Sequence, residues 1–389
     1  MTHLNLASDL SQRAQALEAS KIREIAEIGM KQEGVIPLWF GEGAWPTGSL
    51  IVDAAIASLK AGNHLYQPNN GAGNLRDALA NYTNKLFGIE IDRANVTITP
   101  SGMQGLMLVA EILTTPGDRV VLIEPSWPNI AGAFAAMGAD LVSVTLAPKD
   151  GSWSLDMDCL LDALTPDTKA VLINSPNNPT GWTMSAEEQS IVLEHCRKHG
   201  IWVVADDVYT RLYRHADYAP SFLSIAEPND LLISVNSFSK CWSMTGWRLG
   251  WLVAPATMEA KLGQLTEFNT SCTSGFVQEA GRVAVEQGEG EIASLREKIS
   301  NGYAIAASNL SRFERVEFIQ PDGAFYCFFK VDGMDDSFAA ALEIMEKTKV
   351  GLAPGVAFGA QGEGYLRLCY AQPEQVLIEA FERLEPYLG

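Results

Sequence analysis

The sequence lacks the features that mark several broad classes of protein. No stretch reaches the roughly 18 uninterrupted apolar residues of a membrane-spanning helix, and residues 1–13 are too polar and mixed in charge for a secretory signal peptide. The 6 cysteines in 389 residues include no CxxC pair, so neither a disulfide framework nor a zinc motif is expected. We therefore expect a soluble cytoplasmic protein with free thiols and no membrane partner.

Positive charge is scarce as well. Lys and Arg total 28 against 47 Asp and Glu, which gives a formal net charge of −19. A surface of this sign repels nucleic acid, so we expect no nucleic-acid partner, and a small anion binds only where local residues reverse the field. Gly71-Ala-Gly73 does not continue as GxGxxG and no GxxxxGK[ST] occurs, which disfavours binding of dinucleotides or nucleoside triphosphates. His195 and His199 are four residues apart, but their polar segment favours a solvated helix over a metal site.

Short apolar runs alternate with helical patterns through the middle of the chain. Each run is bounded by turn or polar residues, as buried strands are. The runs are Val96–Pro100, Arg119–Glu124, Asp140–Leu146, Ala170–Asn174, Ile201–Asp206, Leu231–Asn236 and Leu249–Ala254. The helical patterns between them include Met103–Leu113, Ile130–Met137 and Ala186–His199. This alternation predicts an α/β fold with a mainly parallel sheet sandwiched by helices.

The two ends of the chain have a different pattern. Residues 7–30 predict one helical stretch, which the apolar segment Val35–Phe40 follows. Beyond residue 286, a long helix over Gly290–Phe313 leads into a mixed segment. That segment reads strand, helix, strand and helix over Ala324–Lys330, Ser337–Lys347, Gly364–Tyr370 and Pro373–Leu388. We predict a large domain over residues 47–285 and a smaller α+β domain built from residues 1–46 and 286–389.

Residues suited to chemistry follow the predicted strands, where open parallel sheets bind ligands. Lys240 comes just after a strand, beside Ser237 and Ser239, with Arg248 eight positions further on. An exposed turn is the simpler interpretation of a lone lysine. A buried lysine near cationic groups has a lowered pKa and suits Schiff-base chemistry, and an arginine with serine hydroxyls suits a phosphate. The combination favours a ligand site with a Schiff-base lysine and phosphate-binding groups over an exposed turn.

Other strand ends carry weaker signals of the same kind. Asp206 either caps a turn or pairs with a protonated ring nitrogen, as in pyridoxal phosphate (PLP) enzymes. Asn178 lies in a turn rich in Asn and Pro, which is either only a turn or a rigid support for its amide. Ser101 and Gly102 precede a helix, a natural phosphate site. Trp127 either packs or stacks on a flat ring.

Taken in order, these segments closely resemble the class I/II aminotransferases, the fold-type I PLP enzymes. The markers are Gly41-Glu-Gly43, Tyr66-Gln-Pro68, Gly71, Leu75-Arg76, Ser101-Gly102, Pro125-Ser-Trp127, Asn178-Pro-Thr-Gly181, Asp206–Tyr209, Ser237–Lys240, Gly246-Trp-Arg248, Pro354-Gly355, Phe358-Gly359 and Tyr365-Leu-Arg367. The ordered set runs nearly end to end and is far more specific than any one motif. The resemblance implies PLP as cofactor and transfer of an amino group between an amino acid and a 2-oxo acid.

The resemblance also implies catalytic roles. Lys240 would form the Schiff base with PLP and, once displaced by the substrate, act as the base at the substrate α-carbon. Asp206 would pair with the pyridinium nitrogen, and Trp127 would stack on the ring. Tyr209 and Asn178 would hydrogen-bond the phenolic oxygen of the ring.

Further residues are implied to hold the phosphate and the substrate. Ser101, Gly102, Ser237 and Arg248 would hold the phosphate, joined by Ser239. Met103 is a further cofactor-binding residue. Tyr66 would reach the phosphate in the partner subunit, which requires a homodimer. Arg367 would bind the substrate α-carboxylate, helped by the Gly41 backbone and by Asn178, because an arginine fork suits a carboxylate and a glycine admits a ligand close to the backbone.

Departures from the family pattern bear on the substrate. Met103 stands where the aspartate/prephenate branch carries a lysine that recognises a distal carboxylate. Trp39, Trp45 and Trp182 lie in segments that the family places near the site. We therefore expect an apolar side-chain pocket and favour aromatic or other hydrophobic L-amino acids. Residues 125–129 are typical of aspartate and aromatic aminotransferases, so an aspartate aminotransferase stays as an alternative.

Two other functions are compatible with parts of the pattern. Lys240 and Asp206 would also serve a PLP-dependent carbon–sulfur β-lyase, a cyclopropane-forming synthase or a decarboxylase, because fold and cofactor do not decide the reaction. A regulator that uses this fold as a ligand sensor would need a DNA-binding domain. The segment before residue 30 has no room for one, and the charge of −19 opposes it.

Overall fold

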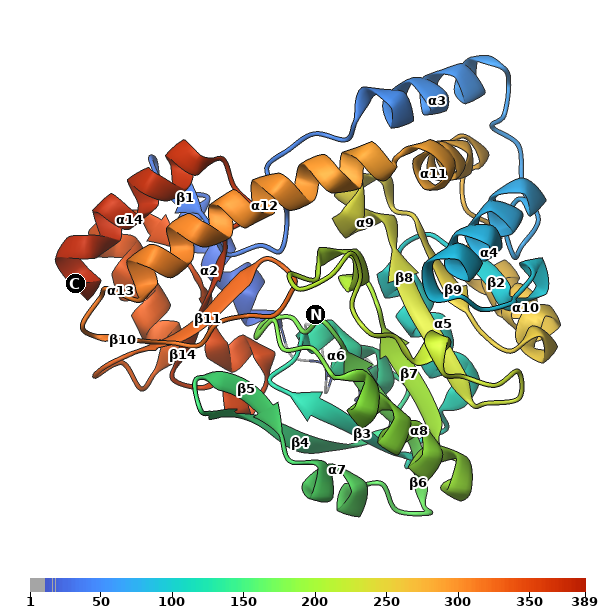
Figure 1. Ribbon diagram of the computed structural model, residues 1–389, viewed down its shortest axis with the longest axis horizontal. Helices are drawn as coiled ribbons and strands as arrows, with labels where there is room; N and C mark the ends of the chain where they lie inside the picture. Colours follow the sequence, from blue (N-terminus) through green and yellow to red (C-terminus); the bar gives the residue numbers. More distant parts are fainter. Residues whose placement is uncertain (1–10, 16, 18) are drawn as a thin grey trace, which may run out of the picture.

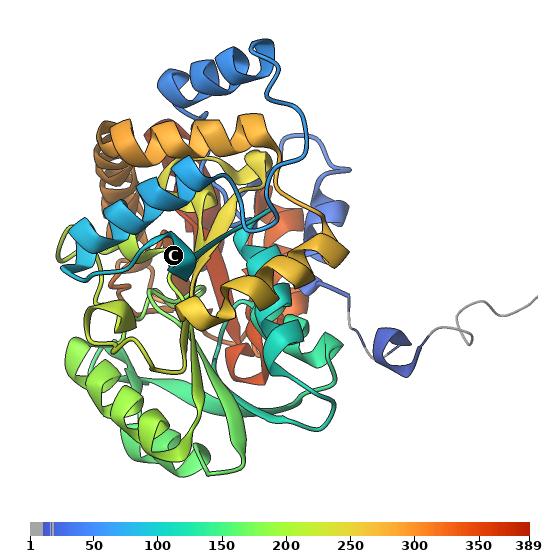
Figure 2. The ribbon, with the colours of Figure 1, turned by 90° about the vertical axis from the view of Figure 1, so that its right-hand side faces the viewer.

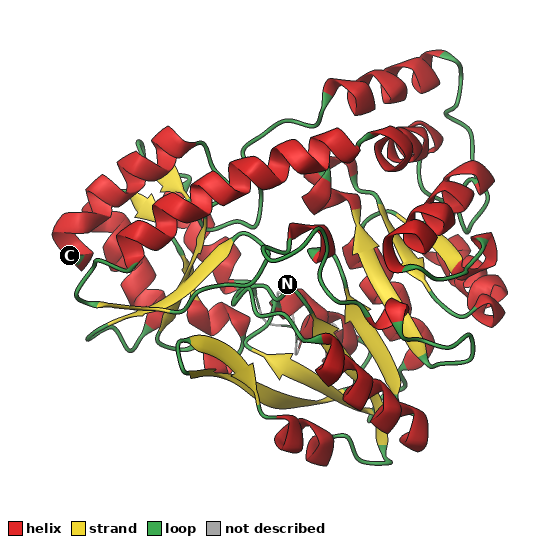
Figure 3. Ribbon diagram, viewed as in Figure 1, coloured by secondary structure: helices red, strands yellow, loops and turns green. Residues whose placement is uncertain are grey.

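The computed structural model describes residues 11–15, 17 and 19–389, and its centre is an eight-stranded sheet between layers of helices (Figures 1 and 3). Across the sheet the order is β2 (Val96–Thr99), β9 (Gly250–Val253), β8 (Leu232–Ser237), β7 (Trp202–Asp206), β6 (Thr168–Asn174), β3 (Arg119–Glu124), β4 (Asp140–Lys149) and β5 (Ser152–Leu155). The five strands from β8 to β4 run parallel, whereas β9 and β5 run opposite to their neighbours. The predicted fold class is confirmed.

Both faces of the central strands β3, β6 and β7 are buried, which is why these strands are mostly apolar. Alternate residues of β3 separate onto two cores, Val120 and Leu122 on one face and Val121 and Ile123 on the other. The first face is covered by α5 (Gly102–Leu113), α6 (Pro128–Ala136) and α10 (Glu259–Asn269). The second face carries α4 (Gly73–Phe87), α7 (Met157–Ala163), α8 (Ala186–His199) and α11 (Gly275–Gln287).

A second, smaller sheet is built near the C-terminus. Its antiparallel order is β10 (Val316–Phe318), β11 (Tyr326–Val331), β14 (Tyr365–Cys369) and β13 (Ala353–Pro354). The helices around it are α2 (Lys21–Gly29), α13 (Ser337–Thr348) and α14 (Glu374–Leu388). The long α12 (Glu289–Leu310) runs between the two parts of the molecule (Figure 1).

The two ends of the chain meet at this second sheet. Strand β1 (Ile36–Pro37) pairs with β12 (Val350–Gly351), and the Leu38 carbonyl accepts a 3.0 Å hydrogen bond from the Cys369 N–H. Helix α3 (Ser49–Lys60) leaves this region and packs on α11 at the edge of the molecule (Figure 2). The division into residues 47–285 and residues 1–46 with 286–389 stays a prediction.

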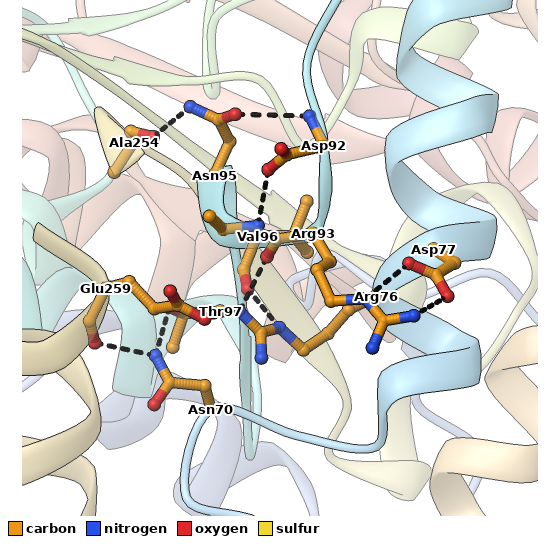
Figure 4. A network of polar contacts seen from close by, with 11 residues as sticks. Asn70, Arg76, Asp77, Asp92, Arg93, Asn95, Val96, Thr97, Ala254 and Glu259 are labelled. Carbon is orange, nitrogen blue, oxygen red and sulfur yellow. Dashed lines mark hydrogen bonds and ion pairs between the residues drawn. The ribbon is translucent and has the colours of Figure 1, made fainter. Parts of the chain in front are cut away.

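Polar side chains anchor the outer strand β2 (Figure 4). The buried Arg76 donates to the Val96 carbonyl at 2.8 Å and the Arg93 carbonyl at 2.6 Å, and it forms an ion pair with Glu259. The Asn95 amide donates to the Ala254 carbonyl at 3.0 Å. These contacts fix the edge from which α5 begins. Arg76, one of the residues that carry the family resemblance, is therefore structural.

Two expectations about the outer elements were wrong. The helix over residues 7–30 is broken among the described residues into α1 (Gln12–Gln15) and α2, because Ser20 begins α2 by accepting a 3.4 Å hydrogen bond from the Arg23 N–H. Residues 7–10 lie outside the described part. Strand β5 was missed because its four residues alternate two serines with apolar side chains. Among the described residues, no helix is long and apolar enough to cross a membrane.

Candidate active site

A cavity of about 330 Å³ lies at the carboxyl ends of β6, β7 and β8, where the second sheet faces the first. Most residues singled out from the sequence line it, although they come from distant parts of the chain. They are Gly41, Gly102, Met103, Trp127, Asn178, Asp206, Tyr209, Ser237, Ser239, Lys240, Arg248 and Arg367. The cavity therefore combines residues of both ends and of the middle of the sequence.

Lys240 enters the cavity from the short helix α9 (Phe238–Cys241), directly after β8. The Ser237 hydroxyl accepts from the Ser239 N–H at 3.1 Å and so begins this turn. The Lys240 Nζ donates to the Gly41 carbonyl at 2.6 Å. Burial, assisted by the charge of Arg367, lowers the pKa of the Lys240 amine to about 8. The amine is thus far closer to its neutral, nucleophilic form at neutral pH than an exposed lysine.

The two adjacent acids that end β7 have different surroundings, because successive strand residues point to opposite faces. Asp207 has two hydroxyl donors, because its Oδ2 accepts from Ser234 Oγ at 2.5 Å and from Ser221 Oγ at 3.3 Å. Asp206 points into the cavity and is 3% exposed. Among the described residues its carboxylate accepts only from the Val208 N–H, at 3.4 Å. Burial raises the pKa of Asp206 to about 7.

Arg367 is brought to the cavity by β14 and is 2% exposed. Its Nη1 donates to Asn178 Oδ1 at 2.7 Å, and its Nη2 donates to the Trp39 carbonyl. Its Nε has no hydrogen-bond partner among the described residues. A buried guanidinium with a free N–H and no carboxylate partner is suited to an anionic ligand.

The start of α5 forms a second candidate anion site. Ser101 has φ of +112° and begins the helix by accepting from the Gln104 N–H at 3.1 Å. The backbone of Gly102 lies so close to β9 that a Cβ on Gly250 would approach the Gly102 nitrogen to 2.5 Å. The exposed Arg248 reaches the same cavity. Free N–H groups at a helix N-terminus together with an arginine favour a phosphate.

Tyr209 and Tyr326 form a pair of buried phenols at the wall of the cavity. Their hydroxyl oxygens are 2.6 Å apart, and burial raises the pKa of both. Tyr209 comes from the large sheet and Tyr326 from β11 of the second sheet. Tyr326 was not predicted, because it lies in a run of apolar strand residues that gives no separate signal.

Two predicted cofactor residues do not line the cavity. Ser101 lies next to it, and its hydroxyl accepts a hydrogen bond at the helix start, which leaves its own hydrogen available to donate. Tyr66 is 88% exposed and lies with Leu65 and Phe276 at a separate hollow. Tyr66 therefore does not reach the cavity of its own chain.

The three tryptophans expected around a side-chain pocket were assigned wrongly. Trp39 is buried against Gly29 and Gly351, and only its carbonyl contacts Arg367. Trp45 and Trp182 are also absent from the cavity wall. The cavity instead has further residues that the sequence did not indicate, namely Ser20, Ile22, Arg23, Phe40, Glu42, Leu106, Asn129, Asn174, Val208, Val235, Thr245 and Tyr326. The α2 residues were missed because only the packing of this helix brings them to the cavity.

A parallel sheet with a lysine, a buried acid and a helix N-terminus at its carboxyl edge, joined by an arginine from a second sheet, defines a PLP-dependent transferase fold. Comparisons with known proteins agree. The model of aminotransferase class I and II matches residues 36–384. The chain therefore belongs to the class I and II aminotransferases, a family of PLP-dependent enzymes.

Individual relatives cover almost the whole chain. An aspartate aminotransferase of Pyrococcus horikoshii is 33% identical over 97% of this chain and 97% of its own. An aromatic-amino-acid aminotransferase of Thermococcus litoralis is 30% identical over 97% of this chain and 98% of its own. The solved structure of a single-mutant aspartate aminotransferase of Thermus thermophilus has a TM-score of 0.91 at 27% identity, covering 97% of this chain and 99% of that one.

The described residues fit the cofactor of this family. The buried Asp206 carboxylate has one long hydrogen bond, so a protonated ring nitrogen would supply the positive partner that its negative charge lacks. The partner-free Nε of Arg367 fits a carboxylate. The glycines at 102 and 250 let the start of α5 pack directly on β9, which holds this helix N-terminus at the cavity.

Proposed function

We propose that this aminotransferase uses PLP bound at Lys240 to move an amino group between an L-amino acid and a 2-oxo acid. One observation carries the proposal. The Lys240 amine, the Asp206 carboxylate and the Arg367 guanidinium meet in one cavity, and none of them has a counter-charge in hydrogen-bond contact among the described residues. Cofactor and substrate would supply the missing charges.

The proposed cofactor site uses residues of the large sheet. Asp206 would hold the protonated ring nitrogen, Trp127 would lie against the ring, and Tyr209 with Asn178 would donate to its phenolic oxygen. The phosphate would be bound at the start of α5 by Ser101 and Gly102 and by Ser237, Ser239 and Arg248. Met103 would also contact the cofactor. When bound, PLP supplies an electron-withdrawing ring that stabilises negative charge at the substrate α-carbon.

Side chains of the protein would bind the substrate α-carboxylate and take up the proton from its α-carbon. Arg367 would bind the substrate α-carboxylate with its guanidinium, with Asn178 and the Gly41 backbone beside it. Lys240 would take up the proton from the α-carbon, because its lowered pKa makes the free amine available near neutral pH. The depth of Asp206 in the protein keeps competing water away from its charge.

For the donor we favour aromatic or other hydrophobic amino acids. The cavity wall includes the apolar side chains of Ile22, Phe40, Met103 and Leu106. Met103 supplies no charge for a distal carboxylate. The relative from Thermococcus litoralis carries the name of an aromatic-amino-acid aminotransferase.

An aspartate aminotransferase is the second candidate, for one specific reason. Arg23 of α2 also lines the cavity, with its guanidinium 6.0 Å from the centre of the Phe40 ring. Among the described residues no carboxylate forms an ion pair with Arg23. The relative from Pyrococcus horikoshii is named an aspartate aminotransferase.

The proposed unit is a homodimer in which Tyr66 binds the phosphate in the partner's cavity. Tyr66 and Leu65 are 88% and 73% exposed, and Phe268 is 86% exposed. The Gln67 N–H donates to Cys272 Sγ at 3.3 Å, which ties the segment of Tyr66 to the segment after Phe268. Large exposed apolar side chains on tied segments are suited to burial against a second copy.

Capture of PLP by the cofactor-free protein tests Lys240. We expect covalent capture, trapped by borohydride and located by mass spectrometry, to accelerate as pH rises through about 8. At pKa 8 about a tenth of the amine is neutral at pH 7, against roughly 0.03% at the ordinary value. Lys240→Ala should capture none, whereas Lys149→Ala, which removes an exposed lysine, should behave as native. Capture by Lys240→Ala, or a midpoint near 10.5, would contradict the assignment.

A panel of amino donors tests the substrate proposal. With pyruvate, 2-oxoglutarate and oxaloacetate as acceptors, we expect kcat/KM for phenylalanine or leucine to exceed that for aspartate by about tenfold or more. Arg23→Gln should lower the aspartate rate more than the phenylalanine rate. Aspartate as much the best donor would favour the second candidate. Release of pyruvate and ammonia from a sulfur amino acid without any acceptor would identify a β-lyase instead.

Sedimentation and PLP affinity test the dimer. The loaded protein should sediment at twice the mass of one chain. Tyr66→Phe should stay dimeric but bind PLP roughly tenfold more weakly, because it loses one hydroxyl donor to a phosphate. Tyr218→Phe, a change at another partly exposed tyrosine, should leave both properties as they are. A loaded monomer, or native PLP affinity in Tyr66→Phe, contradicts the proposal.

A further inference from the structure

Tyr326 is a buried phenol at the cavity that the proposed function does not use. Its side chain is fully buried, and its hydroxyl lies 2.6 Å from that of Tyr209. We propose that Tyr326 is a positioning residue that donates its hydrogen to Tyr209 and thereby strengthens Tyr209 as a donor to the PLP phenolic oxygen. This inference rests on the proposed function and extends it to a residue of the second sheet.

The position of Tyr326 is held firmly from three sides. Strand β11 pairs with β14 so that Tyr326 lies opposite Cys369 and Phe328 lies opposite Arg367. The rings of Tyr326 and Tyr209 meet edge to face at 81°, with their centres 5.8 Å apart. The Tyr326 hydroxyl also abuts Gly41, where an added Cβ would come within 2.0 Å of it. The absence of a side chain at Gly41 thus makes room for this phenol, and the Gly41 carbonyl accepts from Lys240.

The direction of the hydrogen bond follows from counting hydrogens. A phenol has one hydrogen to donate, and among the described residues neither the Tyr209 hydroxyl nor the Tyr326 hydroxyl has another hydrogen-bond partner. If Tyr209 gives its hydrogen to the cofactor, its oxygen is left as an acceptor. Tyr326 is then the only donor within reach of that oxygen in the described part of the chain. In such a chain each bond polarises and strengthens the next.

Arg367 connects the same phenol to the substrate. The guanidinium carbon lies 4.5 Å from the centre of the Tyr326 ring, a cation–π contact, and its charge opposes the rise in the phenol's pKa that burial causes. A more acidic phenol is a stronger donor. Tyr326 therefore lies between the group proposed to bind the substrate carboxylate and the group proposed to bind the cofactor oxygen.

The experiment measures the visible absorption of PLP joined to Lys240 as a function of pH. A strong donor to the phenolic oxygen stabilises its negative charge and lowers the pH at which the bound cofactor loses its proton. Tyr326→Phe should therefore raise the midpoint by a few tenths to about one pH unit. Tyr209→Phe should raise it at least as much. Tyr303→Phe, a change on α12 outside the cavity, should leave the midpoint at the native value.

A double variant shows whether Tyr326 acts through Tyr209 or affects the cofactor independently. Because Tyr326 acts through Tyr209, Tyr209→Phe with Tyr326→Phe should have the midpoint of Tyr209→Phe alone. Shifts that add in full, or a native midpoint in Tyr326→Phe, would overturn the proposal. Should Tyr326→Phe fold poorly, 3-fluorotyrosine at position 326 keeps the hydroxyl and makes it more acidic. It should move the midpoint downward, and an unchanged or raised midpoint would overturn the proposal.

Failure of the proposed function gives a different result from failure of this inference. A native protein that captures no PLP at Lys240 would contradict the function before any midpoint is measured. A native protein that captures PLP normally, with Tyr326→Phe titrating as native, would contradict only the role of Tyr326.

Discussion

The arrangement of the cavity depends on two buried charged side chains, Asp206 and Arg367, that have no partner of opposite charge among the described residues. Asp206 and Arg367 are 3% and 2% exposed, yet the carboxylate accepts one long hydrogen bond and the guanidinium keeps a free Nε among the described residues. The neighbouring Asp207, equally buried, has two serine donors. A pKa raised from 3.8 to about 7 corresponds to a destabilisation on the order of 4 kcal/mol by Asp206 above pH 7. Such a cost is typical of a site prepared for ligands of opposite charge.

The fold brings these charges together through contacts between its two parts. The Lys240 amine reaches the Gly41 carbonyl, Arg367 reaches Asn178, and the Tyr209 hydroxyl meets Tyr326. Each of these bonds joins the large sheet, or the loops at its carboxyl edge, to a segment from one end of the chain. Any change in the relative position of the two parts would therefore alter carboxylate binding and cofactor chemistry together.

Much of this arrangement could be predicted from the sequence. Buried parallel strands are short apolar runs, so the sheet was predictable, and Lys240, Asp206 and Arg367 lie in motifs at strand ends or within an ordered family pattern. Tyr326 and Arg23 were not predictable, since one lies in an apolar strand and the other on a helix placed only by packing. The tryptophans suggested a side-chain pocket, but Trp39 and Trp182 are buried in the core and their side chains do not line the cavity. The predicted role of Tyr66 lies in the cavity of a partner subunit, which one chain does not contain.

The most direct test is the unfolding free energy of cofactor-free protein that carries Asp206→Asn. If Asp206 is an uncompensated charge kept for the cofactor, the variant should be at least as stable as native. Its advantage should grow between about pH 4 and pH 7 and then level off, because over this range the unfolded native chain has lost the Asp206 proton while the folded protein still holds it. The same variant should bind PLP far more weakly. A variant that is less stable than native at pH 8 would show that Asp206 supports the fold itself and would contradict the account.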